Sequence, residues 1–109
     1  MAKTELLSGT LDLLVLRVLN GGPLHGFAIA ERIFVLSKEV LSVEEGSLYP
    51  ALYRMEHKGW IEPEWGQSEN NRRAKFYRLT KSGRKQLEEE EATWSRTAQA
   101  IGWVIKSAQ

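Results

Sequence analysis

The sequence contains no cysteine in its 109 residues. Disulfides, thiolate metal sites and thiol nucleophiles are therefore excluded, and the composition suits a reducing compartment, which points to the cytoplasm. Long apolar runs are also absent, since none approaches the roughly 18–20 residues that a membrane span requires. Charged residues, among them Lys3, Glu5 and Asp12, interrupt the first dozen positions. We therefore expect neither a membrane span nor a secretory signal.

Histidine is scarce as well, and its two copies, His25 and His57, lie far apart. Without cysteine or a carboxylate at ligand spacing they form no metal motif. The sequence shows no Ser-His-Asp order, no glycine-rich phosphate loop and no pair of carboxylates typical of a hydrolase. We therefore expect no metal, no cofactor and no enzymatic activity.

The charges nearly cancel, with 15 basic residues, 14 acidic residues and a net charge of +1. Their distribution is uneven: seven basic residues and no acidic one lie between Arg72 and Lys85, and Glu88–Glu91 follows as four consecutive carboxylates. The basic segment favours an anionic partner. For the acidic run, a cation site is one interpretation, and the solvated first turns of a helix, favoured by the helix dipole, are the other.

Hydrophobic periodicity predicts two helices in the first third of the chain, over residues 10–19 and 25–36. A Gly-Gly-Pro sequence separates them. We expect Ala30, Ile33 and Phe34 to line one side of the second helix.

A third helix is predicted from residue 46 or 47 to Gly59, with Pro50 in its first turn, where the missing N–H is not needed. Leu48, Leu52 and Met55 share one face of this helix. The opposite face is small, aromatic and cationic, with Tyr49 on its flank: Ser47, Pro50, Tyr53, Arg54 and His57. This face is either a surface for nucleic acid or an ordinary solvated helix face.

Two strands follow, over residues 60–65 and 74–79, joined by a hairpin loop at 66–73. Pro63 favours an edge position for the first strand. Thr80 is a suitable N-cap for a final helix of about 25 residues, which would be nearly 40 Å long. A heptad-like seam runs along this helix: Leu87, Trp94, Ala98, Ile101 and Ile105. A small domain cannot cover such a length, so part of the seam is expected to meet another chain.

This order of elements predicts a mainly α fold with a small β-hairpin (α+β), namely a winged helix-turn-helix with a long C-terminal dimerisation helix. Residues 1–80 would form the DNA-binding domain and residues 81–109 the dimerisation helix, in one compact unit. In such folds the third helix enters the DNA major groove and flanking elements hold phosphates.

Several segments carry a family resemblance: LSGTLDLLVLRVL, GGPLHGFAIAERI, EEGSLYPALYRMEHKGWIEPEWG, NRRAKFYRLTKSGRKQLE and a later Trp94. Over about residues 6–105 the chain closely resembles the PadR family of bacterial transcriptional regulators. The resemblance implies a homodimeric repressor that binds a partly palindromic operator in double-stranded DNA. The chain resembles the short subgroup with a single C-terminal helix. In some of its members a Trp in the middle of that helix borders a pocket for flat aromatic effectors, and Trp94 falls at the matching place.

The candidate DNA-binding residues are Ser47, Tyr49, Pro50, Tyr53, Arg54, Arg72, Arg73, Lys75 and His25. The candidate effector-binding residues are Trp94 and Ala98, and the candidate dimer interface consists of Leu87, Trp94, Ala98, Ile101 and Ile105.

Alternatives remain open at this point. His25 and the backbone after it could bind a phosphate at a helix N-terminus, or the imidazole could serve as a local cap. Trp94 and Trp103 could stack on a ligand or pack in the dimer core. The chain as a whole could be a winged-helix module for protein interaction without DNA binding.

Overall fold

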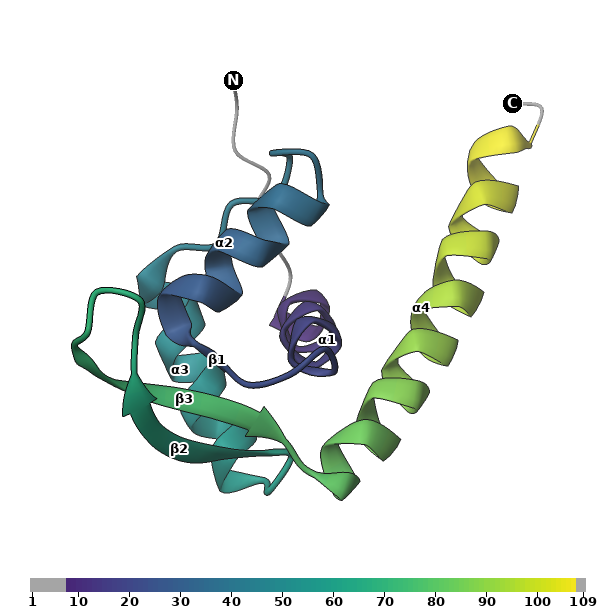
Figure 1. Cartoon of the computed structure of the whole chain (residues 1–109). Helices are drawn as coiled ribbons and strands as arrows, with labels where there is room; N and C mark the ends of the chain where they lie inside the picture. Colours follow the sequence, from purple (N-terminus) through teal and green to yellow (C-terminus); the bar gives the residue numbers. More distant parts are fainter. Residues whose placement is uncertain (1–7, 108–109) are drawn as a thin grey trace.

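The computed structural model describes residues 8–107. Residues 1–7, on which the prediction about a secretory signal partly rests, and residues 108–109 lie outside this description. The elements follow in the order α1 (Ser8–Leu19), β1 (Leu24–His25), α2 (Gly26–Leu36), α3 (Glu45–His57), β2 (Ile61–Gln67), β3 (Arg73–Leu79) and α4 (Lys81–Lys106) (Figure 1). The predicted α+β class with a long last helix is confirmed.

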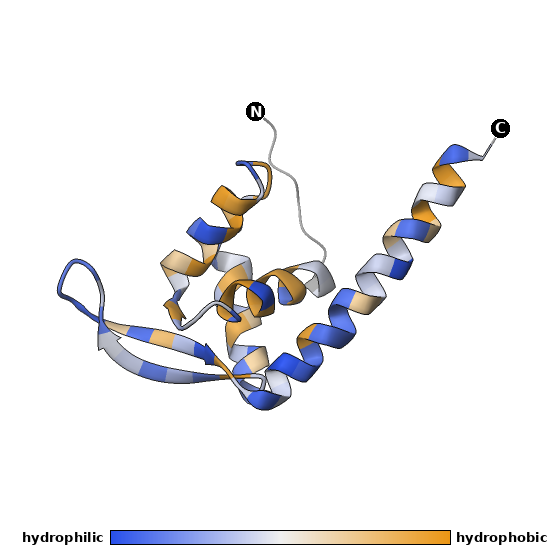
Figure 2. Ribbon diagram, turned by 45° about the vertical axis from the view of Figure 1, so that its right-hand side comes forward, coloured by the Kyte–Doolittle hydropathy of each residue, from blue (hydrophilic) through white to orange (hydrophobic). Residues whose placement is uncertain are grey.

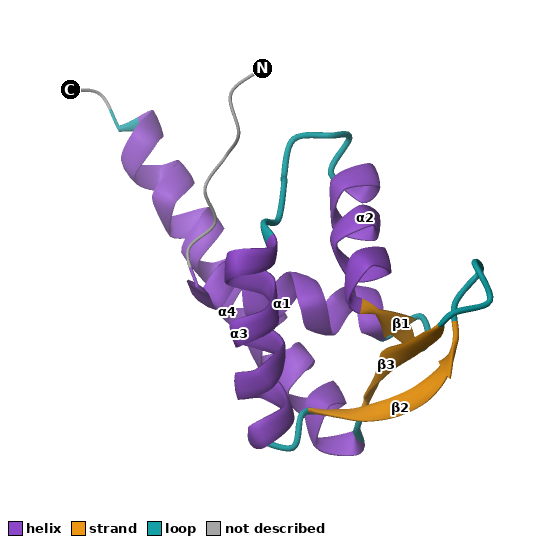
Figure 3. Cartoon of the chain, turned by 90° about the vertical axis from the view of Figure 1, so that its left-hand side faces the viewer, coloured by secondary structure: helices purple, strands orange, loops and turns teal. Residues whose placement is uncertain are grey.

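The sheet has three antiparallel strands in the order β1-β3-β2 (Figure 3). Sequence analysis predicted β2 and β3 but missed β1, which pairs Leu24 with Tyr77 and His25 with Phe76. Strand β2 lies at the edge, as Pro63 indicated. The hairpin strands are longer at the loop end than predicted, so the loop between them contains residues 68–72. We call these strands and their loop, residues 61–79, the wing.

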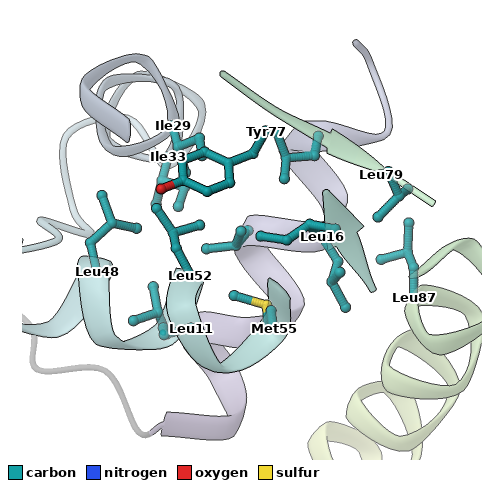
Figure 4. Packing of buried hydrophobic residues seen from close by; sticks show 14 residues of the cluster. Leu11, Leu16, Ile29, Ile33, Leu48, Leu52, Met55, Tyr77, Leu79 and Leu87 are labelled. Atoms are coloured by element: carbon teal, nitrogen blue, oxygen red, sulfur yellow. The ribbon is translucent and has the colours of Figure 1, made fainter. Parts of the chain in front are cut away.

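The hydrophobic core is formed by side chains from α1, α2, α3, the sheet and the start of α4 (Figure 4). Helix α2 contributes Ile29 and Ile33, which are four residues apart and therefore lie on one helical face. Phe34 was expected on this buried side, but 38% of it is exposed. The prediction was wrong because Phe34 lies about 100° around the helix from Ile33.

Helix α3 presents the face that its periodicity predicts, with Leu48, Leu52 and Met55 buried. Its C-terminal turn is also as predicted, since Gly59 follows the cap residue with a φ of 78°. The start of the helix was misplaced: it begins at Glu45, so Pro50 lies inside the helix rather than in the first turn. Having no N–H, Pro50 cannot donate to the carbonyl one turn before it.

Helix α4 begins at the predicted cap. The Thr80 hydroxyl accepts a hydrogen bond from the Gly83 N–H at 3.0 Å, and the Thr80 N–H donates to the Trp60 carbonyl at 3.0 Å. Gly83 lies so close to the turn between α3 and β2 that a Cβ there would be 2.0 Å from the Trp60 oxygen. The base of α4 is thus pressed against the body of the domain.

Leu87 does not belong to the exposed seam. It is 4% exposed and points from α4 towards Leu79 in the core of its own chain (Figure 4), so its assignment to a dimer interface was wrong. The helix diverges from the domain beyond this residue, and its C-terminal half stands clear of the other elements in both Figure 1 and Figure 2. Apolar residues on that half are exposed: Trp94, Ile101, Trp103, Val104 and Ile105.

Candidate nucleic-acid interface

The outer face of α3 is exposed, as the sequence predicts, at Ser47, Tyr49, Pro50 and Tyr53. Tyr53 is 73% exposed, and its ring stacks on His57 with centroids 6.3 Å apart. The carboxylates of this helix are Glu45, in its first turn, and Glu56, near its C-terminus. The middle of the face therefore combines hydroxyl groups with aromatic surface and carries no negative charge.

Tyr49 connects this face to the start of α2. A Cβ at position 26 would lie 2.5 Å from the Tyr49 hydroxyl oxygen, so only glycine lets the ring approach the α2 backbone this closely. No local pattern in the sequence indicates this contact, because it joins two helices across 23 residues of chain. The packing holds the Tyr49 ring in place beside the wing.

Arg54 does not share the outer face with its neighbours. Its Nη2 donates to Asp12 Oδ1 of α1 at 2.5 Å, and its side chain is half-buried. Burial raises the pKa of Asp12 above its ordinary value, and this effect outweighs the lowering by Arg54. The guanidinium predicted to contact DNA is thus bound to a carboxylate of α1.

The three predicted cations of the wing differ in their exposure and in their partners. Arg72 and Arg73 are exposed, and the Arg73 guanidinium lies 4.6 Å from the centre of the Trp65 ring. Lys75 pairs with Glu56 of α3, with Nζ 3.2 Å from Oε1, so part of its charge is neutralised. Trp65, which sequence analysis did not select, is 58% exposed and forms a flat surface under Arg73.

Another cation of the wing and one carboxylate of the acidic run form ion pairs. Arg78 forms ion pairs with Glu62 and Glu64 of the neighbouring strand. In the acidic run, Glu91 lies 3.6 Å from Arg17 of α1. Within the wing, the positive charge available to a partner therefore concentrates at Arg72 in the hydrophilic loop and at Arg73, the first residue of β3 (Figure 2).

A cleft of about 630 Å³ lies between the wing, the start of α2 and the flank of α3. Its walls include five of the predicted DNA-binding residues: His25, Tyr49, Arg72, Arg73 and Lys75. Glu31 and Glu69 line it too. Ser47, Pro50 and Tyr53 lie outside this cleft, on the exposed face of α3. The predicted site is thus one exposed helix face beside one mixed but mainly cationic cleft.

His25 serves as the local cap of α2. Its Nδ1 accepts a hydrogen bond from the Ala28 N–H at 3.2 Å, and its ring packs edge-to-face on Phe76 at 5.3 Å. The Ala28 N–H is therefore satisfied within the chain. Of the two interpretations offered by the sequence, the structure shows the capping one.

The described part of the chain, residues 8–107, contains neither a metal-binding cluster nor a membrane-spanning helix. No group of three or more His, Cys, Asp or Glu side chains in this range is arranged to hold a metal ion. No helix in the described part of the chain has the length and apolarity needed to cross a membrane.

Comparison with known proteins places the fold among regulators. A family model described as the transcriptional regulator PadR-like family matches residues 15–89. A solved transcriptional regulator from Clostridium thermocellum is 28% identical with a TM-score of 0.82, over 90% of this chain and 95% of that one. A PadR family transcriptional regulator from Eggerthella lenta DSM 2243 is 31% identical with a TM-score of 0.76, over 92% and 85%. An uncharacterized protein X of Lysinibacillus sphaericus is 27% identical over 101 residues, 93% of each chain.

The solved relatives are named as transcriptional regulators rather than enzymes, in agreement with the expectation from the sequence. Their similarity covers the whole arrangement from α1 to α4, because nine-tenths or more of this chain is matched.

Proposed function

The chain belongs to the PadR-like family of transcriptional regulators, and from this membership we propose that it is a homodimeric, sequence-specific repressor acting in the bacterial cytoplasm. The observation that carries the proposal is the placement of an uncharged, exposed face of α3 next to the cationic tip of the wing. A helix of this kind can enter the major groove while the loop beside it holds the sugar–phosphate backbone. We keep residues 1–80 as the DNA-binding unit and residues 81–109 as the dimerisation helix.

In this proposal α3 and the wing contact different parts of the DNA. Ser47, Tyr49, Pro50 and Tyr53 face the bases and adjoining phosphates, since they are exposed on the outer face of α3. Arg72 and Arg73 contact phosphates, which position the protein but carry no sequence information. Lys75 contributes less, because Glu56 competes for its ammonium group.

The exposed half of α4 supports a dimer. Its apolar side chains, such as Trp103 and Ile105, lie along a projecting helix, and monomeric proteins rarely expose apolar patches of this kind. Pairing with a second α4 would bury them and relate two copies of α3 by two-fold symmetry. The two helices would then reach successive major grooves, roughly 34 Å apart, on a partly palindromic operator.

We also propose that a small effector releases the repressor from DNA. A planar apolar compound would bind near Trp94 and Ala98, in the middle of α4, where both side chains are exposed in the single chain. Quenching of tryptophan fluorescence by such compounds should disappear in Trp94→Ala and persist in Trp65→Ala, because Trp65 lies on the wing. Quenching that survives Trp94→Ala would place the compound elsewhere.

The decisive experiment is an anisotropy titration of labelled DNA from the upstream region of the protein's own gene, against a scrambled fragment, over a salt series. We expect selective binding with a steep salt dependence. Arg72→Ala/Arg73→Ala removes four phosphate contacts from a dimer, so the slope of log K against log salt should fall by about 3.6. Lys81→Ala/Lys85→Ala removes the same charge at the base of α4 and should change the slope little.

Equal, weak binding to both fragments by a folded dimer would contradict the proposal. The winged-helix module for protein interaction would then be the better interpretation. Indifference of DNA binding to Arg72→Ala/Arg73→Ala would point the same way.

A further inference from the structure

Asp12 is unusual among the described residues because it alone is both charged and buried, with 7% of its surface exposed. It lies in α1, the helix that packs against α2, α3 and α4. Its carboxylate accepts a hydrogen bond from Arg54. The other charged groups that act on it are Lys58, the C-cap residue after α3, and Glu90 of α4. A buried charge at the junction of three helices calls for a physical explanation.

A gain in the net stability of the fold does not explain why this charge is buried. Burial raises the pKa of Asp12 although the Arg54 guanidinium lies 2.5 Å away. The ionised carboxylate is therefore less favourable in the folded protein than in water. Replacing a buried ion pair by apolar side chains is often neutral or stabilising, whereas removing one partner is strongly unfavourable. What such a pair can supply is a fixed geometry between the two elements that carry it.

The geometry that this pair can fix is the orientation of α3, the helix proposed to face DNA. Arg54 follows Tyr53 directly, so a hold on Arg54 constrains the rotation of α3 about its own axis. The apolar side chains on the inner face of α3 would tolerate small rotations, because dispersion contacts are not directional. A charge-assisted hydrogen bond from a planar guanidinium has a defined direction.

We propose that Arg54 is a positioning residue, which sets the rotation of α3 on α1 by binding Asp12 and so orients the exposed face of α3 towards DNA. The inference rests on the proposed DNA-binding function and changes the role expected of Arg54 from contact to orientation. If Arg54 instead left Asp12 to bind a phosphate, it would strand a buried carboxylate without its partner.

The two roles predict opposite signs for Asp12→Asn. If Arg54 contacts DNA, this substitution frees the guanidinium and removes a negative charge, so DNA should bind more tightly. If Arg54 positions α3, affinity for the upstream fragment should fall by about threefold to tenfold, with an unchanged salt slope. Glu90→Gln is the matched control, since it removes a nearby carboxylate that is not bonded to Arg54.

A double-mutant cycle with Arg54→Met completes the test. Because both substitutions weaken the same interaction, the double variant should bind no more weakly than Arg54→Met alone. A salt slope lowered by about 1.8 per dimer in Arg54→Met would show two lost phosphate contacts and overturn the proposal. Tighter or equal binding by Asp12→Asn, in a variant that is folded and dimeric, would overturn it as well.

A measurement without DNA separates this inference from the proposed function. In ¹⁵N NMR spectra, Asp12→Asn should shift the backbone amides of residues 47–54 and leave those of the wing loop, residues 68–72, in place. Unchanged α3 amides would refute positioning even if the wild type binds its operator. If the wild type binds the upstream fragment no more tightly than the scrambled one, only the proposed function is refuted.

Discussion

Gly83→Ala should destabilise the protein although alanine is the better helix former. The new Cβ would lie 2.0 Å from the Trp60 carbonyl oxygen, whereas real contacts of this kind are at least 3.0 Å long. The base of α4 must therefore move by about 1 Å, because the obstacle is a backbone atom that no side-chain rotation can remove. The Leu79 side chain, 2.7 Å from the same Cβ, adds to the clash.

The size of the effect follows from what this movement disturbs. The Trp60 carbonyl accepts hydrogen bonds from both the N–H and the hydroxyl of Thr80, each 3.0 Å long. Weakening them costs about 1–2 kcal/mol in total, and overpacking costs a further ~1–3 kcal/mol. The helix propensity of alanine returns about 1 kcal/mol. We expect the free energy of unfolding to fall by about 1–4 kcal/mol, and Tm by roughly 5 °C or more.

Urea denaturation followed by far-UV circular dichroism would measure this change. Gly102→Ala is the control, because it makes the same substitution in the same helix and its Cβ would meet nothing within 4 Å. That variant should gain up to about 1 kcal/mol. Both should be compared with the wild type at one protein concentration. A Gly83→Ala protein as stable as the Gly102→Ala protein would refute the close contact on which the argument depends.

Three further predictions concern other parts of the molecule. Gly26→Ala puts its Cβ 2.5 Å from the Tyr49 hydroxyl, a flexible side-chain end, so stability should change by less than about 1 kcal/mol while DNA affinity falls about threefold to tenfold, by anisotropy titration. Ile105→Asp should leave the fold intact but halve the mass found by sedimentation equilibrium, and a persistent dimer would exclude this part of α4 from the interface. Because the pKa of Asp12 is raised from 3.8, the folded state holds its proton more tightly than the unfolded chain, so its contribution to stability falls as pH rises from about 4. The stability of the wild type should therefore decline more steeply over that range than that of Asp12→Asn in urea titrations, and parallel profiles would contradict the raised pKa.

Sequence reasoning succeeded where the signal is local. The cap at Thr80, the turn at Gly59 and the buried face of α3 each depend on residues within one or two helical turns, and all were predicted correctly. The exposed face of α3 followed directly, because it is the complement of the buried one.

Contacts between distant residues account for what was missed. Strand β1 has only two residues and exists because β3 offers it a partner. Arg54 and Asp12 are 42 positions apart, and no helical pattern indicates that one cation of an outer face turns inward to a carboxylate. Leu87 fits both a seam between chains and a core within one chain, and only the path of α4 decides between them.

The attachment of α4 at one end makes it a lever. Its 26 residues span about 39 Å, but Leu87 is buried in the core, so the free arm runs from Leu87 to Lys106 and is about 29 Å long. By simple trigonometry, a rotation of about 10° at Leu87 moves the far end by about 5 Å. Conversely, a modest displacement of the far end of α4 produces a small tilt of the elements α1 to β3, which carry the proposed DNA-binding surface.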